Sequence, residues 1–456
     1  LVPCSHRGRR LPLAIQLSGQ AAKRGLIPRL PPADRLLDDV EAWLGNEYPD
    51  IVRSSRREEL PSGGAELRVD LHPAADDATF RVSEAGEVTL SAVTAPVGPG
   101  YHTFVSRMAQ RLASDVSIEW SDDPPAPPVD GLAAPAPAPS GFTNGHGDDA
   151  ARQAFGDRAT IERAHLARLG ATIAAVRDAY QRGARSIHVD TPPGVRYEFE
   201  GVLATPLGPR DAAWLEAAVG DPRVAVELSP WWADATDARY LLNRALCLMW
   251  TEVRWRPAAD PAERAVLDEV ARLLWRAHPL DPSLPYPWRE WAELLDLRGV
   301  DEPLAGDIRE RAASTANDGR LIGYRRGPVT VGHEGWTLEI PGSFAERRSL
   351  EEWWGGEGGR SVTLAAVETG TESGPMSAAG FLHQVAGHLG SEALRHEAGE
   401  LIGRARLGTD ATSGIEVGVV EGYSAVRGRG AALRIEFADA TDWQWALDTW
   451  RGLTPV

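Results

Sequence analysis

A stretch rich in proline and alanine divides this chain of 456 residues into two parts. Residues 122–147 read DDPPAPPVDGLAAPAPAPSGFTNGHG, in which proline and alanine alternate over most of the middle. Because proline lacks a backbone donor and favours extended polyproline geometry, such a run pairs into neither helix nor sheet. We therefore expect a linker over residues 123–147, with separately folded segments before and after it.

The segment before the linker, residues 32–122, has the hydrophobic pattern of a small α/β unit. Apolar residues at helical spacing near each end, with alternating apolar residues between them, predict the order α-β-β-β-α-β. Residues 1–31 contain six basic side chains and no acidic one. Their main apolar run is interrupted by Pro12 and Gln16, so we expect a disordered basic leader or a stretch encoded upstream of the natural start.

The segment after the linker, residues 148–233, resembles the first segment in its predicted element order. A long helix is followed by strands, a turn and a second helix. The turn Thr205–Pro209 (TPLGP) matches Ala95–Pro99 (APVGP) at a constant offset of 110 residues. We interpret the segments as two α/β units related by a diverged duplication. Chance similarity between two turns rich in proline and glycine is the alternative.

Residues 234–316 are predicted to be helical, because apolar side chains recur at a spacing of 3.6 residues. Eight of the sixteen tryptophans of the chain lie between Trp214 and Trp291. An indole buries much area and needs a single acceptor for its N–H, so we expect most of these side chains in the core. A minority are expected to line a groove in this tryptophan-rich region.

The last segment, residues 323–456, contains alternating strand patterns, a helix in the middle and a capped helix near the end. It begins with Gly335–Pro341 (GWTLEIP), a strand that carries a tryptophan and ends in proline. With the strands and helices that follow, this segment resembles the PsbP-like fold family, which includes photosystem subunits and a GTPase-binding nuclear transport factor. The resemblance implies an α/β sandwich with a meandering antiparallel sheet and a protein-binding or accessory role. The chain as a whole is predicted to be a multidomain α+β protein.

The residue inventory excludes several classes of enzyme. Lys23 is the sole lysine, so a Schiff-base enzyme, a P-loop NTPase and a protein kinase lack the lysine that each requires. The two cysteines, Cys4 and Cys247, are far apart in the sequence, which excludes thiolate zinc sites and iron–sulfur clusters. Histidines at helical metal-ligand spacing are also missing, because His383 and His388 do not share a helical face. We expect no metal and no cofactor.

The charge of the chain bears on its partners. A net charge of −17 makes nucleic acid and an anionic membrane surface poor partners, since both require a basic face. The sequence has no apolar run of the ~18 residues that a membrane span needs. We therefore expect a cytoplasmic protein without a nucleic-acid or membrane partner.

Two short motifs are candidates for catalysis. In Gly98-Pro99-Gly100-Tyr101-His102, a glycine-rich turn that opens a helix could present backbone N–H groups to an anion, with His102 as acid or base. In the stretch 231–237 (WWADATD), Asp234 and Asp237 stand beside Trp231 and Trp232, as in a sugar site with an acid/base pair. The structural alternatives are a strand-to-helix turn and a helix that is capped by Asp234 and carries Asp237 at its third position.

A third motif suggests a binding contact. Trp353 and Trp354 precede a run rich in glycine, Gly355–Gly359, which predicts a flexible loop with two aromatic side chains. Exposed tryptophan is common in protein-binding hot spots, so we expect both side chains to contact another protein, with Trp231, Trp232 and Tyr101 as further candidates. The sequence thus favours a non-enzymatic interaction or scaffold protein. The alternative is a metal-independent hydrolase with its site near His102 or Asp234 and Asp237.

Overall fold

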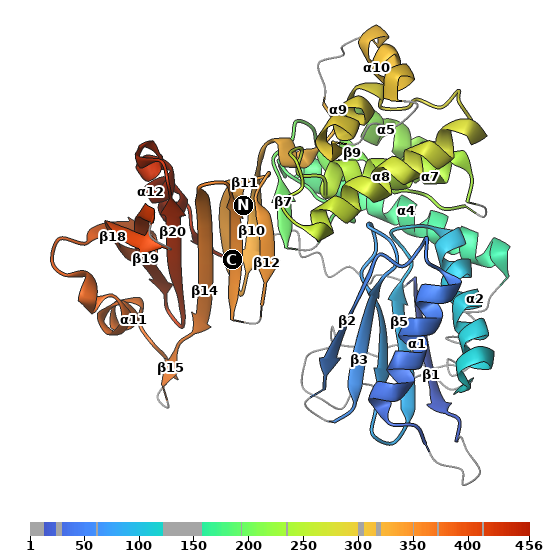
Figure 1. Cartoon of the computed structure of the whole chain (residues 1–456), viewed down its shortest axis with the longest axis horizontal. Helices are drawn as coiled ribbons and strands as arrows, with labels where there is room; N and C mark the ends of the chain where they lie inside the picture. The colour runs from blue at the N-terminus through green and yellow to red at the C-terminus, as the bar shows by residue number, and fades with distance from the viewer. Residues whose placement is uncertain are drawn as a thin grey trace. The chain divides into compact units, whose positions relative to one another are not determined.

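The computed structural model describes residues 13–23, 30–60, 63–121, 157–192, 194–233, 236–299, 305–315, 321–349, 351–371, 374–412 and 415–456. The expected linker over residues 123–147 lies outside these ranges. The predicted multidomain α+β class is confirmed, since helices and several sheets alternate along the chain (Figure 1).

The chain divides into two compact units. The first unit comprises Leu1–Pro192, Glu200–Leu248 and Arg272–Tyr286, and the second unit comprises Pro193–Phe199, Met249–Ala271 and Pro287–Val456. Each unit therefore draws on several stretches of sequence. The segment Pro193–Phe199 belongs to the second unit, and the chain returns to the first unit at Arg272–Tyr286.

The first unit is built on an antiparallel sheet of six strands in the order β2-β3-β4-β5-β1-β6. The strands are β1 (Ala14–Ala21), β2 (Ser54–Glu59), β3 (Ala65–Asp70), β4 (Ala78–Val82), β5 (Glu87–Val93) and β6 (Ile118–Trp120). Helix α1 (Ala33–Glu47) packs on β3 and β4, and helix α2 (Pro99–Val116) packs on β1 and β6. The two helices touch each other and cover one face of the sheet (Figure 1).

The expected disordered leader is wrong for its central part, which forms strand β1. Ile15 and Leu17 are 0% and 2% exposed and alternate with polar residues, so one face of the strand belongs to the core. β1 pairs with β5 from Ala14↔Val93 to Gln20↔Glu87, and with β6 on its other side. The basic residues that suggested disorder lie before and after this strand, and they leave its hydrophobic alternation intact.

The remainder of the first unit does not repeat this sheet in the residues that the structure describes. It contains the helices α4 (Arg158–Gln181), α5 (Ala212–Gly220) and α6 (Pro222–Ala225), and the hairpin β8 (Leu203–Thr205) and β9 (Gly208–Arg210). The TPLGP turn connects the strands of this hairpin, whereas APVGP leads from β5 into α2. The topology therefore favours chance similarity over duplication.

The segment predicted to be helical contains α7 (Ala238–Thr251), α8 (Pro261–Leu280), α9 (Trp288–Arg298) and α10 (Ala305–Ser314). Asp260 accepts a hydrogen bond from the backbone N–H of Glu263 at 2.9 Å and so stabilises the start of α8. The side chain of Trp291 is fully buried, as expected for most indoles of this region.

In the residues that the structure describes, the second unit contains two larger antiparallel sheets and a short hairpin of β15 (Gly370–Thr371) and β16 (Gly374–Pro375). The larger has the order β12-β13-β14-β20-β19-β18-β17, and the smaller has the order β21-β11-β10-β7. The larger sheet consists of β12 (Ala345–Arg348), β13 (Glu352–Glu357), β14 (Arg360–Glu368), β17 (Leu394–Ala398), β18 (Leu401–Thr412), β19 (Ile415–Val426) and β20 (Arg429–Phe437). The smaller consists of β7 (Val195–Tyr197), β10 (Pro328–His333), β11 (Trp336–Pro341) and β21 (Thr454–Pro455).

Two helices pack on opposite faces of the larger sheet. Helix α12 (Trp443–Arg451) places the indole of Trp450 against Gly403 and Gly422, where a Cβ on Gly422 would lie 2.4 Å from the ring. Helix α11 (Ala378–Val385) places Phe381 against Gly430 in the same way on the other face. Glycine in these strands therefore makes room for an aromatic ring, which explains why strands of unusual glycine content are stable.

Strand β7 is distant in sequence from the rest of its sheet, and it makes a testable contribution to stability. Tyr197 is buried, and its ring stacks on Tyr324 with 4.6 Å between ring centroids. We expect Tyr197→Ala to lower the free energy of unfolding of the second unit by about 3 kcal/mol, as for other large core truncations. Denaturant unfolding followed by tryptophan fluorescence measures this change. Trp443→Ala, which removes an exposed aromatic side chain from α12 of the same unit, is the control, and an equal loss in both variants would show that β7 is not needed.

Candidate functional site

The two adjacent tryptophans lie in strand β13 and not in a flexible loop. Alternation along a strand sends Trp353 and Trp354 to opposite faces of the sheet. Trp353 is 0% exposed, and its Nε1–H donates to Oε2 of Glu346 at 3.2 Å. The expectation that Trp353 contacts a partner is therefore wrong. The sequence predicts a loop here because it does not show which neighbouring side chains fill the space above a glycine in a strand.

Each indole of this pair uses the glycine two residues further along its own face. A Cβ on Gly355 would lie 2.5 Å from the ring of Trp353, and a Cβ on Gly356 would lie 2.7 Å from the ring of Trp354. Positions i and i+2 share a face of a strand, so the sequence Trp-Trp-Gly-Gly serves both faces at once. Only the turn beyond β13, at Gly358 and Gly359, connects strands as a loop.

Trp354 remains partly exposed on the face of the larger sheet that is opposite to Trp353. Register places Arg347 of β12 and Thr363 of β14 directly beside it. The guanidinium carbon of Arg347 lies 5.0 Å from the centre of the Trp354 ring, a cation–π distance. Arg347 forms no ion pair within the part of the chain that the structure describes. The pair thus combines an aromatic surface with free guanidinium donors.

We call the solvent-facing part of this sheet around Trp354 the open face. It consists of Arg347, Trp354, Thr363, Ala365, Ala432 and Arg434, which are neighbours by register across β12, β13, β14 and β20. The side chains of these residues are partly or fully exposed, whereas the residues that alternate with them on β13, β14 and β20 include the buried Trp353, Val362, Leu364, Ala431 and Leu433. Helix α11 packs further along the same face, on β18, β19 and β20.

The charged groups at the far side of the open face are largely paired. Arg434 donates to Asp410 at 2.6 Å and to Glu436 at 2.8 Å. Burial favours a higher pKa for Glu421, but hydrogen bonds from His388 and Tyr423 outweigh it and hold that pKa below its ordinary value. These pairs fix the border of the open face beside α11, whereas Arg347 stays available on the other side.

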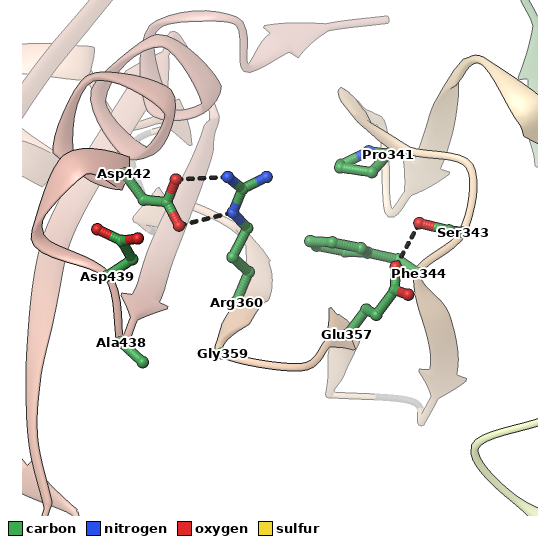
Figure 2. Close-up of a pocket in the computed structure, with 9 residues that line it drawn as sticks. All are labelled: Pro341, Ser343, Phe344, Glu357, Gly359, Arg360, Ala438, Asp439 and Asp442. Carbon is green, nitrogen blue, oxygen red and sulfur yellow. Dashed lines mark hydrogen bonds and ion pairs between the residues drawn. The ribbon is translucent and has the colours of Figure 1, made fainter. Parts of the chain in front are cut away.

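A separate pocket of about 460 Å³ lies at the end of the same sheet (Figure 2). Arg360 donates to both carboxylate oxygens of Asp442, through Nε at 2.7 Å and through Nη2. The backbone N–H and the hydroxyl of Thr441 hydrogen-bond to Asp439 and hold the pKa of that carboxyl below its usual value. Across the pocket, Ser343 donates to Glu357.

The charges of this pocket serve mainly to join structural elements. The Arg360–Asp442 pair links the β13–β14 turn to the start of α12, and Glu357 also lies 3.3 Å from Nε of Arg256. The described lining residues include no histidine that could activate Ser343. The pocket therefore does not assemble a nucleophile with its base.

The candidates in the first unit are buried in its core. Tyr101 and Trp232 lie with 6.3 Å between ring centroids, and Trp232 stacks on Tyr240 at 4.4 Å. Burial raises the pKa of the Tyr101 hydroxyl well above its ordinary value. Because Tyr101 is 1% exposed and Trp232 is 6% exposed, the expectation that they contact a partner is wrong. Trp231 is partly exposed and remains a candidate.

His102 is also buried, and its surroundings are structural. Its Nδ1 lies 2.9 Å from the hydroxyl of Thr94, and its ring packs edge-on against His165. The N–H of Gly100 donates to the carbonyl of Trp232 at 2.7 Å, so this glycine does not offer its donor to an anion. The structural interpretation of this segment as a strand-to-helix turn is confirmed.

The carboxylate pair of the second motif is not formed by the described residues. Asp237 accepts a hydrogen bond from the backbone N–H of Tyr240 at 2.8 Å and so caps α7. The sequence assigned the cap to Asp234, but α7 begins at Ala238 and the cap is Asp237. Asp234 lies outside the described residues.

The side chain of Cys247 is buried, as expected from its apolar surroundings. Among the described residues, no group of three or more histidine, cysteine, aspartate or glutamate side chains is arranged to hold a metal ion. Within the same residues, no helix combines the length and the apolar character that crossing a membrane requires.

Comparison with known proteins adds little to this geometry. No family model matches the chain, and no curated protein matches it. Among solved structures, a protein from Bacteroides thetaiotaomicron VPI-5482 matches 27% of this chain with a TM-score of 0.23 and 8% sequence identity. The chain covers 45% of the length of that protein. A likeness this slight carries no argument about fold or function.

The sequence did not identify the partners of Trp354 on the open face. Arg347 and Thr363 become its neighbours only through strand register, and Arg434, the next residue of the same row beyond Thr363, belongs to β20, which lies far away in sequence. One local signal was available, because each tryptophan is followed two residues later by glycine. That spacing is typical of an aromatic ring folded over a strand.

Proposed function

We propose that this protein is a non-enzymatic binding protein that recognises another protein through the open face. The observation that supports the proposal is Trp354, a partly exposed indole in the middle of a sheet face, held under Arg347. Tryptophan and arginine dominate hot spots because each offers a large contact area or several donors at a small entropy cost. The resemblance of residues 323–456 to the PsbP-like family, which includes accessory proteins, agrees with this role.

The alternative of a metal-independent hydrolase has less support. A hydrolytic site requires a general base that a substrate can reach, and His102 is 3% exposed. Asp237 is engaged in capping a helix. No observation on the described residues favours catalysis over binding.

The test is a comparison of two exposed tryptophans in the second unit. A partner isolated from the native host with the full chain as bait is purified, and its dissociation constant is measured for each variant. We expect Trp354→Ala to weaken binding by more than about 30-fold, which corresponds to about 2 kcal/mol. Trp443→Ala, which removes an indole that is 46% exposed on α12, should change affinity less than about twofold.

Both variants should keep the melting temperature of the wild type, because neither indole is part of the core. Equal affinity of wild type and Trp354→Ala would contradict the proposal. Hydrolysis of ester, glycoside or phosphate substrates that is lost in His102→Ala would replace it with the enzyme alternative.

A further inference from the structure

The open face has a shallow floor between taller side chains. Thr363 and Ala365 of β14 and Ala432 of β20 project short side chains, whereas Trp354 rises on one side and Arg434 on the other. Val367 continues the same row along β14 and is 50% exposed. Because side chains two residues apart lie about 6.6 Å apart along a strand, this floor is long enough for several residues of an extended segment.

The floor is largely apolar, and one of its borders carries a free cation. Ala365 and Ala432 are partly exposed, Val367 is exposed, and the partly exposed Thr363 adds a short side chain with one methyl group. The guanidinium carbon of Arg347 lies 5.0 Å from the centre of the Trp354 ring, and a cation–π contact of this kind uses none of the guanidinium N–H groups as donors to an oxygen. Arg347 has no carboxylate partner within the described ranges, whereas Arg434 at the opposite border has two.

This arrangement defines the chemistry of an occupant. Apolar side chains of a partner would fill the floor and pack against the indole of Trp354, which removes exposed methyl groups from water. A carboxylate beside those apolar side chains would receive two parallel N–H donors from Arg347, the geometry that guanidinium groups form best. A basic residue at the same place would meet Arg347 without a counter-charge.

Glu352 makes the two ends of one border of the floor different in charge. It lies beside Ala365 by register, is exposed, and forms no ion pair with any residue that the structure describes. The border next to β13 is therefore positive at Arg347 and negative at Glu352. A segment with one carboxylate would be bound with that carboxylate toward Arg347 and away from Glu352.

We propose, on the basis of the proposed function, that the open face binds a short segment of a partner protein that presents apolar side chains beside a carboxylate. The apolar side chains lie over Thr363, Ala365 and Ala432 against Trp354. The carboxylate binds Arg347. The specificity of the surface thus comes from a hydrophobic contact and from one ion pair that fixes the position of the bound segment.

The probe is a library of random 12-residue peptides displayed on phage and selected on the full chain. The best peptide is synthesised, and its dissociation constant is measured by fluorescence anisotropy. We expect the selected peptides to share two or more apolar residues next to an aspartate or glutamate. Trp354→Ala and Ala365→Arg, which fills the floor, should each weaken binding by more than about 30-fold.

The charge is tested by reversal and rescue. Arg347→Glu should raise the dissociation constant of the acidic peptide by more than about tenfold. A peptide with lysine in place of its acidic residue should regain affinity for this variant. Arg427→Glu makes the same charge change at the exposed β19–β20 turn, and it should alter affinity less than about twofold. Thr409→Arg, at an exposed strand position outside the open face, is the control for Ala365→Arg.

The outcomes separate this inference from the proposed function. If Trp354→Ala weakens peptide binding but Arg347→Glu binds the peptides as tightly as the wild type, the proposed contact between a carboxylate and Arg347 is wrong. The open face would then still be the binding surface. If no selected peptide depends on Trp354 or Ala365, this inference is overturned. The proposed function then fails as well if the purified partner also binds Trp354→Ala with unchanged affinity. Melting temperatures equal to that of the wild type exclude misfolding, since all substituted positions are solvent-facing.

Discussion

Trp353→Ala should lower the free energy of unfolding of the second unit by about 3–5 kcal/mol, the range found when a large core aromatic is truncated. The side chain is fully buried against Gly355, where no neighbouring Cβ exists to fill the space left by the indole. Its N–H also satisfies Glu346, which binds Arg325 and Arg254 at 2.9 and 3.0 Å. Loss of the indole therefore creates a cavity and removes one donor from a buried ionic network.

The adjacent residue is the matched control for this prediction. Trp354→Ala removes an identical side chain from the same strand, but on the solvent side, so it should cost less than about 1 kcal/mol. Denaturant unfolding followed by far-ultraviolet circular dichroism compares the two variants without relying on tryptophan emission. Equal destabilisation in both variants would mean that the assigned faces of β13 are incorrect.

The same pair of residues shows how far sequence patterns determine the site. The sequence singled out Trp353 and Trp354 as a unit, but a strand separates them, and only one remains available for binding. A hydrophobic pattern with glycine predicts a loop, because the pattern does not show whether an aromatic ring from a neighbouring position covers the glycine. The packing of Trp450 on Gly403 and Gly422 is hidden for the same reason, since these glycines belong to two different strands.

The sequence predicts some elements of the first unit and gives no signal for others. Strands β3, β4 and β5 and helices α1 and α2 have regular apolar patterns, and they occur where the sequence predicts them. Strand β2 reads SSRREE, so an edge strand without apolar residues gave no signal. The sequence does not predict strand β1, because its buried residues Ile15, Leu17 and Ala21 stand in a stretch flanked by basic residues. Its pairing with β5 joins residues 67 to 79 positions apart in sequence, from Gln20↔Glu87 to Ala14↔Val93, which no local pattern encodes.

Acid should destabilise the first unit, because two of its buried histidines resist protonation. Burial is the main cause that lowers the pKa of His165 to about 4, and the charge of Arg168 adds to it. Burial likewise lowers the pKa of His72 well below 6.5, with Arg244 and Arg53 as further causes. In the unfolded chain both rings bind a proton near pH 6.5, so below that pH the unfolded state binds more protons than the folded state.

The sign of the effect follows from this difference. Stability is complete above pH 6.5, falls as the pH decreases from 6.5 toward 4, and loses nothing more from His165 below its folded-state pKa. A displacement from 6.5 to about 4 corresponds to about 3 kcal/mol for His165 alone. The ring of Trp231 packs edge-on against His165, so its fluorescence monitors this part of the first unit.

The measurement is a series of denaturant unfolding curves between pH 7.5 and pH 4 for wild type and His165→Leu. His165 also donates from Nδ1 to the carbonyl of Ile161 at 2.9 Å, so the variant loses that bond and is less stable at neutral pH. The decisive quantity is the slope of the free energy of unfolding against pH. This slope should be smaller in His165→Leu because leucine takes up no proton. Val219→Ala, an exposed side chain without a titratable group on α5 of the same unit, is the control for the effect of a substitution as such and should keep the slope of the wild type. A His165→Leu slope equal to that of the wild type would assign the acid sensitivity to other groups, with His72→Gln as the next variant.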